Sequence, residues 1–196
     1  MKKKIVITGA LGYIGTELCK LYSGVSWHHN ITVIDNRFIS ERVNQLRNWN
    51  MEFIQGDILD KDLIKKHCSE VDVIHHLAGV TNVPRTKSEA SNTQDDKIKE
   101  VGEKGTQNIL DVMSDSCKII FPSTHVVYEG INEVRTDIVE DEITKPVLSY
   151  SSSKAINENQ LKKSGKNYVI LRLGSVYGYS TDSMRIDIMP NLFSKI

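Results

Sequence analysis

The chain has 196 residues, 39% of them hydrophobic, which suits one sizeable core and either a single domain or one domain with part of a second. Its 25 basic and 25 acidic residues give a formal net charge of zero. No overall field therefore attracts nucleic acid or an acidic membrane, and we expect neither as a partner.

Three cysteines, Cys19, Cys68 and Cys117, are far apart, odd in number and without metal-ligand spacing. This pattern favours reduced structural thiols over a disulfide framework and indicates no metal site. The apolar run that follows the first four residues is only Ile5 to Thr8, too short for a signal peptide or a membrane span. We expect a cytoplasmic protein.

Short β-branched apolar runs alternate with stretches of helical length. One such stretch, Thr93 to Met113, has apolar residues at roughly helical spacing. Alternating strands and helices predict a parallel sheet, and right-handed crossovers favour an α/β, Rossmann-type doubly wound sheet with helices on both faces. The acidic stretch from Glu129 to Pro146 is expected to be a surface connection. The predicted strands are Ile5 to Ile7, Ile31 to Ile34, Val71 to Ile74, Ile119 to Phe121 and Val169 to Leu171.

The first strand runs into a TGxxGxxG pattern, and a helix can follow from Tyr13 to Tyr22. This is a phosphate-binding turn. Gly9 permits the tight turn, and Gly12 lets the backbone approach a pyrophosphate. Gly15 lets the helix pack on the strand while its N-terminal amides face the anion.

Asp35 ends the second predicted strand, twenty residues after Gly15. A carboxylate in this place can accept both hydroxyls of an adenosine ribose. Because Asp35 would repel a 2′-phosphate, the sequence favours NAD over NADP, although Arg37 could in principle partner a phosphate.

Further along the chain, Gly56-Asp57-Ile58 comes before the predicted strand Val71 to Ile74, and His76-Leu77-Ala78-Gly79 comes after it. With the glycine turn and Asp35, this ordered series resembles the extended short-chain dehydrogenases/reductases, in particular the NAD-dependent epimerase/dehydratase family with its UDP-glucose 4-epimerase-like members. The likeness extends from Lys4 almost to the last residue. It implies that Asp57 and Ile58 flank the adenine and that 77–79 form the wall beside the pyrophosphate and nicotinamide ribose. The NAD-binding residues expected are Gly9, Leu11, Gly12, Tyr13, Ile14, Gly15, Asp35, Asn36, Asp57, Ile58, Leu77, Ala78, Gly79, Tyr150 and Lys154.

His75 and His76 are adjacent on a strand. Their side chains must point to opposite faces of the sheet, so the two cannot form one metal site by themselves. We interpret both as packing or hydrogen-bonded histidines.

Tyr150 and Lys154 are four residues apart, so they share a helix face if Tyr150 opens a helix. An adjacent ammonium favours a phenolate and lowers a tyrosine pKa toward the working range. Thr124, at a strand end, resembles the family's catalytic hydroxyl. The resemblance implies that Thr124 hydrogen-bonds the substrate oxygen, that Tyr150 moves its proton, and that Lys154 tunes Tyr150 and holds the nicotinamide ribose.

The chain departs from the family pattern in three places. His125 and Val126 stand where sugar-nucleotide dehydratases typically supply acids, which disfavours dehydration. Ser175 stands where relatives commonly have an Asn that touches the sugar nucleotide, so its substrate contact is left open. Gly102 replaces an Asn often found before Gly-Thr, which puts a helix-packing or water-bridging contact in doubt.

The sequence thus favours an NAD-dependent epimerase-like oxidoreductase that oxidises a secondary alcohol of a nucleotide sugar transiently. An NAD(P)-dependent reductase, a sugar-nucleotide dehydratase and a non-catalytic dinucleotide sensor or scaffold are the alternatives. We expect residues 1–180 to form the NAD-binding domain and residues 181–196 to begin a substrate-binding region that is largely missing, either by truncation or with completion by self-association, such as a homodimer. An apolar helical stripe is expected in this last segment, at Ile188, Leu192, Phe193 and Ile196.

Overall fold

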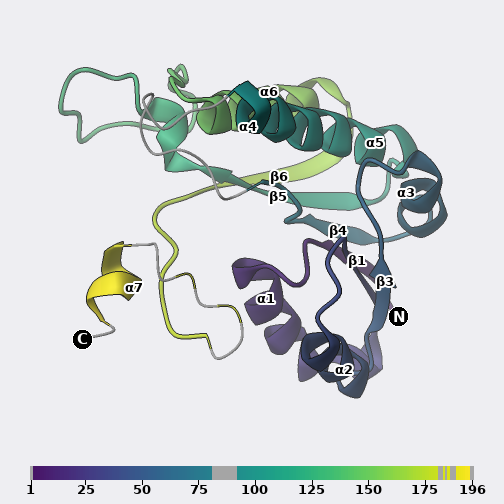
Figure 1. The fold of residues 1–196 in the computed structure, drawn as a ribbon. Coiled ribbons are helices and arrows are strands. Elements are labelled where there is room, and N and C mark those ends of the chain that lie inside the picture. The colour runs from purple at the N-terminus through teal and green to yellow at the C-terminus, as the bar shows by residue number, and fades with distance from the viewer. Residues whose placement is uncertain (1, 81–91, 181–182, 184, 186–188, 195–196) are drawn as a thin grey trace.

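The computed structural model describes residues 2–80, 92–180, 183, 185 and 189–194. Its centre is a six-stranded sheet in the order β3-β2-β1-β4-β5-β6, in which every neighbouring pair is parallel (Figure 1). The chain is therefore an α/β protein with a Rossmann-type sheet, as predicted. The strands are β1 Lys4–Thr8, β2 Asn30–Asp35, β3 Glu52–Gln55, β4 Val73–His76, β5 Lys118–Thr124 and β6 Asn167–Leu173.

The strand order reverses at β1, which pairs with β2 on one side and with β4 on the other. In the register, Thr8 lies opposite Ile34 of β2 and His76 of β4. The carboxyl ends of β1, β2 and β4 consequently meet at one edge of the sheet. Such a reversal opens a crevice where ligands of doubly wound folds bind.

Helices cover both faces of the sheet, with α1 and α2 on one side and α4, α5 and α6 on the other (Figure 1). Each face has its own apolar core: Cys19 of α1 and Leu46 of α2 share one core with Ile5, while Ile64 of α3 and Ile109 of α5 lie in the opposite core. This two-sided burial explains why the strands are apolar on both faces. The helices are α1 Tyr13–Ser23, α2 Ser40–Asn48, α3 Lys61–Cys68, α4 Asn92–Lys99, α5 Gly105–Val112, α6 Ser149–Lys163 and α7 Met189–Phe193.

The helix predicted from Thr93 to Met113 is present but contains a π-helical segment, η3, at Glu100–Lys104 between α4 and α5. Gly102 lies at its centre, and a Cβ there would overlap the hydroxyl of Ser153 on α6. Asn157 of α6 also donates to the Gly102 carbonyl at 3.0 Å. Glycine at this departure from the family pattern therefore lets η3 and α6 pack closely.

The two histidines of β4 do face opposite sides. His75 Nε2 lies 2.9 Å from the hydroxyl of Tyr22 on α1, whereas His76 contacts Thr8 and Thr106 through its two ring nitrogens at 2.9 and 3.1 Å. Burial, together with a smaller effect of the Lys154 ammonium, lowers the pKa of His76 to about 3. The interpretation of both as packed, hydrogen-bonded histidines is confirmed.

The three cysteines are free and buried, as the sequence predicts. Burial raises the thiol pKa to about 12 in Cys19 and Cys68 and to about 11 in Cys117. They therefore stay protonated and unreactive at neutral pH.

The stretch from Glu129 to Pro146 contains no helix or strand, as expected of a connection. The apolar helical stripe predicted near the C-terminus stays a prediction. Ile188 and Ile196 lie outside the described residues, and α7 spans only five residues. Within the part of the chain that the structure describes, no helix has the length and apolar character needed to cross a bilayer.

Candidate dinucleotide and catalytic site

A cleft of about 1660 Å³ opens at the carboxyl ends of the strands. Every residue predicted to bind the cofactor or substrate, or to act in catalysis, lines it. These are Gly9, Leu11, Gly12, Tyr13, Ile14, Gly15, Asp35, Asn36, Asp57, Ile58, Leu77, Ala78, Gly79, Thr124, Tyr150, Lys154 and Ser175.

The glycine turn is built on close backbone approaches. Gly9 has a φ of +71°, and a Cβ there would lie 2.7 Å from the amide nitrogen of Ala78. A Cβ on Gly15 would overlap the Gly9 carbonyl and lie 2.8 Å from Ala10 Cα. Gly12 precedes α1 with extended backbone and no side-chain cap. The first amides of α1 are thus left to bind an anion in the cleft.

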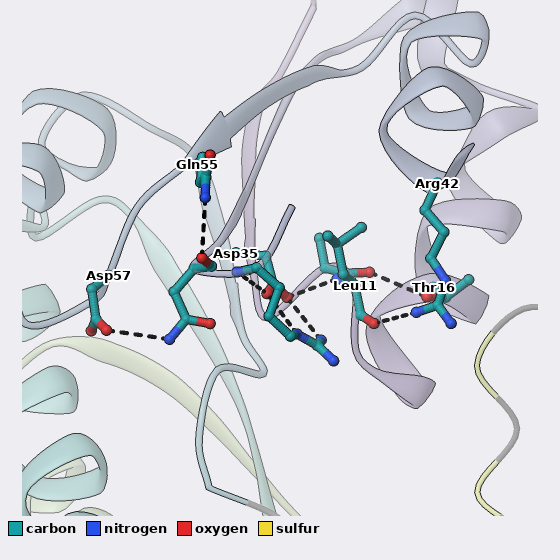
Figure 2. Close-up of polar contacts among 9 residues, drawn as sticks. Leu11, Thr16, Asp35, Arg42, Gln55 and Asp57 are labelled. Carbon is teal, nitrogen blue, oxygen red and sulfur yellow. Dashed lines mark hydrogen bonds and ion pairs between the residues drawn. The ribbon is translucent and has the colours of Figure 1, made fainter. Parts of the chain in front are cut away.

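Asp35 is 5% exposed at the end of β2. Its carboxylate accepts the backbone amide of Leu11 at 2.9 Å and that of Arg37 at 3.0 Å. The Arg37 guanidinium adds bonds of 3.0 Å from Nε and 3.3 Å from Nη2. Arg42 donates to the Leu11 carbonyl at 2.7 Å, so Leu11 lies between Asp35 and Arg42 (Figure 2).

The predicted adenine side of the cleft is held by amide and carboxylate groups. Asn36 donates to Asp57 at 3.3 Å, and Gln55 donates to the Asn36 carbonyl at 3.4 Å (Figure 2). Asp57 also accepts the backbone amide of Leu59. Ile58 is 4% exposed and provides apolar surface beside this polar group.

Lys154 reaches the cleft from α6, which begins at Ser149, so Tyr150 does lie in the first turn of a helix. Its ammonium donates to the Pro122 carbonyl at 2.8 Å and lies 4.4 Å from the centre of the Phe121 ring. Burial lowers the pKa of Lys154 to about 8, although the Glu158 carboxylate raises it.

The predicted tuning of Tyr150 by Lys154 is wrong for this structure. The Lys154 ammonium lies 6.0 Å from the centre of the Tyr150 ring. Burial raises the pKa of Tyr150, and the cation that opposes this rise is Arg185. A shared helix face brings the two side chains near one another but does not outweigh the desolvation of a phenolate.

Thr124 ends β5 and is 8% exposed. Its hydroxyl oxygen accepts the amide of Val126 at 3.3 Å and caps the short 3-10 helix η4, His125–Tyr128. His125 Nδ1 lies 3.1 Å from the Leu173 carbonyl of β6. His125 thus contacts the neighbouring strand.

Two carboxylates that the sequence reasoning missed support α6. Glu129 accepts the amides of Val147 and Leu148 at 2.8 and 2.7 Å and also the hydroxyl of Ser151, so it caps the helix that carries Tyr150. These hydrogen bonds hold the pKa of Glu129 below its ordinary value, against burial that raises it.

The second carboxylate, Glu158, is buried farther along α6. It accepts the Ser123 hydroxyl at 2.6 Å and hydrogen bonds from the Arg172 guanidinium, from Nε at 3.0 and 3.3 Å and from Nη2 at 2.6 Å. Both partners lie more than ten residues away, on β5 and β6, so no local pattern marks them.

The segment after β6 is tied back to the glycine turn. The Tyr13 hydroxyl donates to the Gly178 carbonyl at 2.6 Å. Asn191 of α7, 2% exposed, accepts the Gly178 amide at 2.9 Å and donates to the Arg185 carbonyl at 2.9 Å. Arg185 and Ser175 therefore line the same cleft as Tyr150.

Comparison with known proteins agrees with this geometry. The model of the NAD dependent epimerase/dehydratase family matches residues 5–196. A putative UDP-glucose 4-epimerase of Methanocaldococcus jannaschii is 32% identical over 91% of this chain and 57% of its own length. A dTDP-D-glucose 4,6-dehydratase of Dictyostelium discoideum is 28% identical over 90% of this chain and 44% of its own.

Among solved structures, the UDP-glucuronic acid 4-epimerase of Bacillus cereus in complex with UDP-glucuronic acid and NAD superimposes with a TM-score of 0.76 at 28% identity. The match covers 96% of this chain and 60% of that one. The chain thus spans between 44% and 60% of the length of these relatives. It belongs to the NAD-dependent epimerase/dehydratase family.

Proposed function

We propose that this chain is the NAD-binding and proton-transferring part of a nucleotide-sugar epimerase that acts by transient oxidation of a secondary alcohol. One observation carries the proposal: Thr124, Tyr150 and Lys154 line the same continuous cleft as the glycine turn and Asp35. A pure dinucleotide sensor has no need of the first three residues.

The residues present fit NAD. The close approaches at Gly9 and Gly15 leave the α1 amides facing the cleft for a pyrophosphate. Asp35 at the end of β2 lies in the position that contacts an adenosine ribose in this fold. NAD, when bound, supplies a hydride acceptor that can return the hydride within one turnover.

In this proposal Thr124 donates a hydrogen bond to the reacting oxygen, while Tyr150 takes the hydroxyl proton and gives it back. Tyr150 would enter this step as the phenolate, which is converted to the phenol when it accepts the proton. Because burial raises the pKa of Tyr150, the phenol then holds the proton until it is returned. Lys154, held by the Pro122 carbonyl, would contact the nicotinamide ribose.

The substrate is proposed to be a nucleotide sugar bound on the side of the cleft lined by Ser175 and Arg185. We further propose that residues 1–180 form the NAD-binding domain and that residues 181–196 begin the substrate-binding part. The hydrogen bond between the Gly178 amide and Asn191 ties the later segment to the earlier one. A homodimer remains part of the proposal.

His125 and Val126 stand where a dehydratase would need acids. The His125 side chain contacts the backbone carbonyl of Leu173, which indicates a structural role for it. Epimerisation is therefore favoured over dehydration. An epimerase recycles its NAD, whereas a reductase consumes NAD(P)H and releases a reduced product.

The test incubates the protein with NAD and UDP-, GDP- or dTDP-sugars in D₂O. These 196 residues alone are expected to bind NAD with little or no turnover. When they are joined to a whole substrate-binding part, we expect epimerised sugar from at least one of these substrates, with no deuterium at the inverted carbon because the same hydride returns. Tyr150→Phe should abolish epimerisation while NAD binding persists. Deuterium at that carbon, stoichiometric consumption of NADH, or full activity in Tyr150→Phe would contradict the proposal.

A further inference from the structure

The environment of Asp35 differs from what its position alone suggests. An ionised carboxylate has about four lone-pair sites. Here Oδ1 accepts the amide and Nε of Arg37, and Oδ2 accepts the Leu11 amide and Nη2 of Arg37. All four are filled by the protein, so the unphosphorylated ribose can bind Asp35 only by displacing the guanidinium.

The guanidinium also shields the carboxylate. The Arg37 side chain is 52% exposed and that of Asp35 is 4% exposed. The group presented to the cleft at this end is therefore cationic. This weakens the repulsion of a 2′-phosphate that Asp35 would otherwise impose.

Arg37 has N–H donors that Asp35 does not use. A guanidinium has five N–H groups, and Asp35 uses those on Nε and one on Nη2, so Nη1 stays available to a ligand. Arg42 also lines the cleft and uses Nη1 for the Leu11 carbonyl, which leaves the rest of its fork. Two such forks suit the bidentate recognition of a phosphate.

Negative charge at this end is limited among the described residues that line it. Asp35 is paired with Arg37, and Asp57 accepts hydrogen bonds from Asn36 and Leu59. Arg42 makes its hydrogen bond to a backbone carbonyl and adds a positive charge. The charges of these side chains therefore cancel around the ribose position, and they do not repel a further anion.

We propose that Arg37 and Arg42 form a binding site for the 2′-phosphate of NADP, so that the cleft binds NADP as well as NAD. The inference rests on the proposed dinucleotide function. Arg37 acts as the selecting residue: it competes with the ribose of NAD for Asp35 and contacts the additional phosphate of NADP while remaining paired.

Titration calorimetry with NAD and NADP tests this without any turnover. We expect the wild-type dissociation constant for NADP to lie within about thirtyfold of that for NAD. Adenosine 2′,5′-bisphosphate should bind more tightly than AMP. In Arg37→Ala the affinity for NADP should fall about tenfold or more. The affinity for NAD should stay or rise, because Asp35 regains acceptor capacity.

Arg47→Ala is the matched control, since Arg47 is an exposed residue of α2 outside the cleft and its loss removes the same charge. It should change neither affinity. Arg42→Gln keeps a donor for the Leu11 carbonyl and should weaken NADP selectively.

The inference is overturned if NAD binds and NADP is weaker by more than the stated factor. Equal losses for both dinucleotides in Arg37→Ala, an unchanged NADP affinity there, or a matching effect of Arg47→Ala would overturn it as well. Failure of the wild type to bind either dinucleotide would instead remove the proposed function itself.

Discussion

The two halves of the cleft are built by different means. The half formed by β1, α1 and β2 depends on backbone amides and on glycines whose neighbours leave no room for a Cβ. The half formed by β5, α6 and β6 depends on buried ionisable side chains, namely Lys154, Glu158 and Arg172. Packing shapes the glycine turn of the first half, whereas the second half depends on the pairing of its charged side chains.

This difference separates binding from chemistry. Steric contacts at the glycine turn do not depend on pH, whereas the groups around Lys154 change charge or pay desolvation. Damage to the glycine turn should lower dinucleotide affinity at any pH. Damage to the second half should change stability and proton transfer and leave most of the affinity intact.

The largest expected effect is that of Glu158→Gln. The Arg172 side chain is 13% exposed and would lose its buried carboxylate partner. Breaking a buried pair from one side costs about 3–5 kcal/mol of unfolding free energy. Urea denaturation measures this. Lys162→Ala is the control, because its ammonium lies 3.8 Å from the same carboxylate but is 48% exposed, and it should cost at most about 1 kcal/mol. Similar losses of unfolding free energy in the two variants would show that the buried pair of Glu158 and Arg172 does not stabilise this half.

Gly15→Ala should damage the other half. The new Cβ would overlap the Gly9 carbonyl, and overpacking of this kind costs about 1–3 kcal/mol. Because the α1 amides must shift, NAD affinity should fall about tenfold to hundredfold. Calorimetry checks the affinity. Gly174→Ala also lies on the cleft but has nothing within 4 Å of its Cβ position, and it should bind NAD as the wild type does. An unaffected Gly15→Ala would refute the steric account.

The smallest of the three expected effects is the change in folding stability caused by Lys154→Met. The folded pKa of Lys154, about 8, lies below its ordinary 10.5. Below pH 8 the folded protein must hold the ammonium in the cleft, which costs stability. Stability is regained as the pH rises from 8 to 10.5, where the unfolded chain binds more protons.

Lys154→Met should therefore be more stable than the wild type at pH 7, by on the order of 2 kcal/mol since the cleft leaves the ammonium partly hydrated. The difference should vanish above about pH 10.5. Thermal denaturation at several pH values measures it, with Lys162→Met as the control. A less stable Lys154→Met at pH 7 would contradict the prediction.

The features that the sequence predicted well are those coded locally. The alternation of apolar strands and helices, the glycine turn and the acid ending β2 follow one another in the chain and are all present. The opposite orientations of His75 and His76 follow from the period of a strand. Each of these needs only neighbouring residues.

The features that were missed depend on tertiary contacts. Glu129 caps a helix that begins twenty residues later, and Arg172 meets Glu158 only through the pairing of β6 with the sheet. The pKa of Tyr150 was predicted with the wrong sign, because spacing reveals a nearby cation but not the burial that outweighs it. Asp35 was located correctly, yet its saturation by Arg37 is visible only in three dimensions.

The structure of the protein in complex with NAD tests the central claim most directly. We expect the pyrophosphate at the first amides of α1, between Gly12 and Gly15, the adenosine ribose beside Asp35, and the nicotinamide ring facing Tyr150 and Lys154. A dinucleotide bound outside the cleft, or one whose nicotinamide points away from Tyr150, would contradict the assignment of binding to one half of the cleft and chemistry to the other.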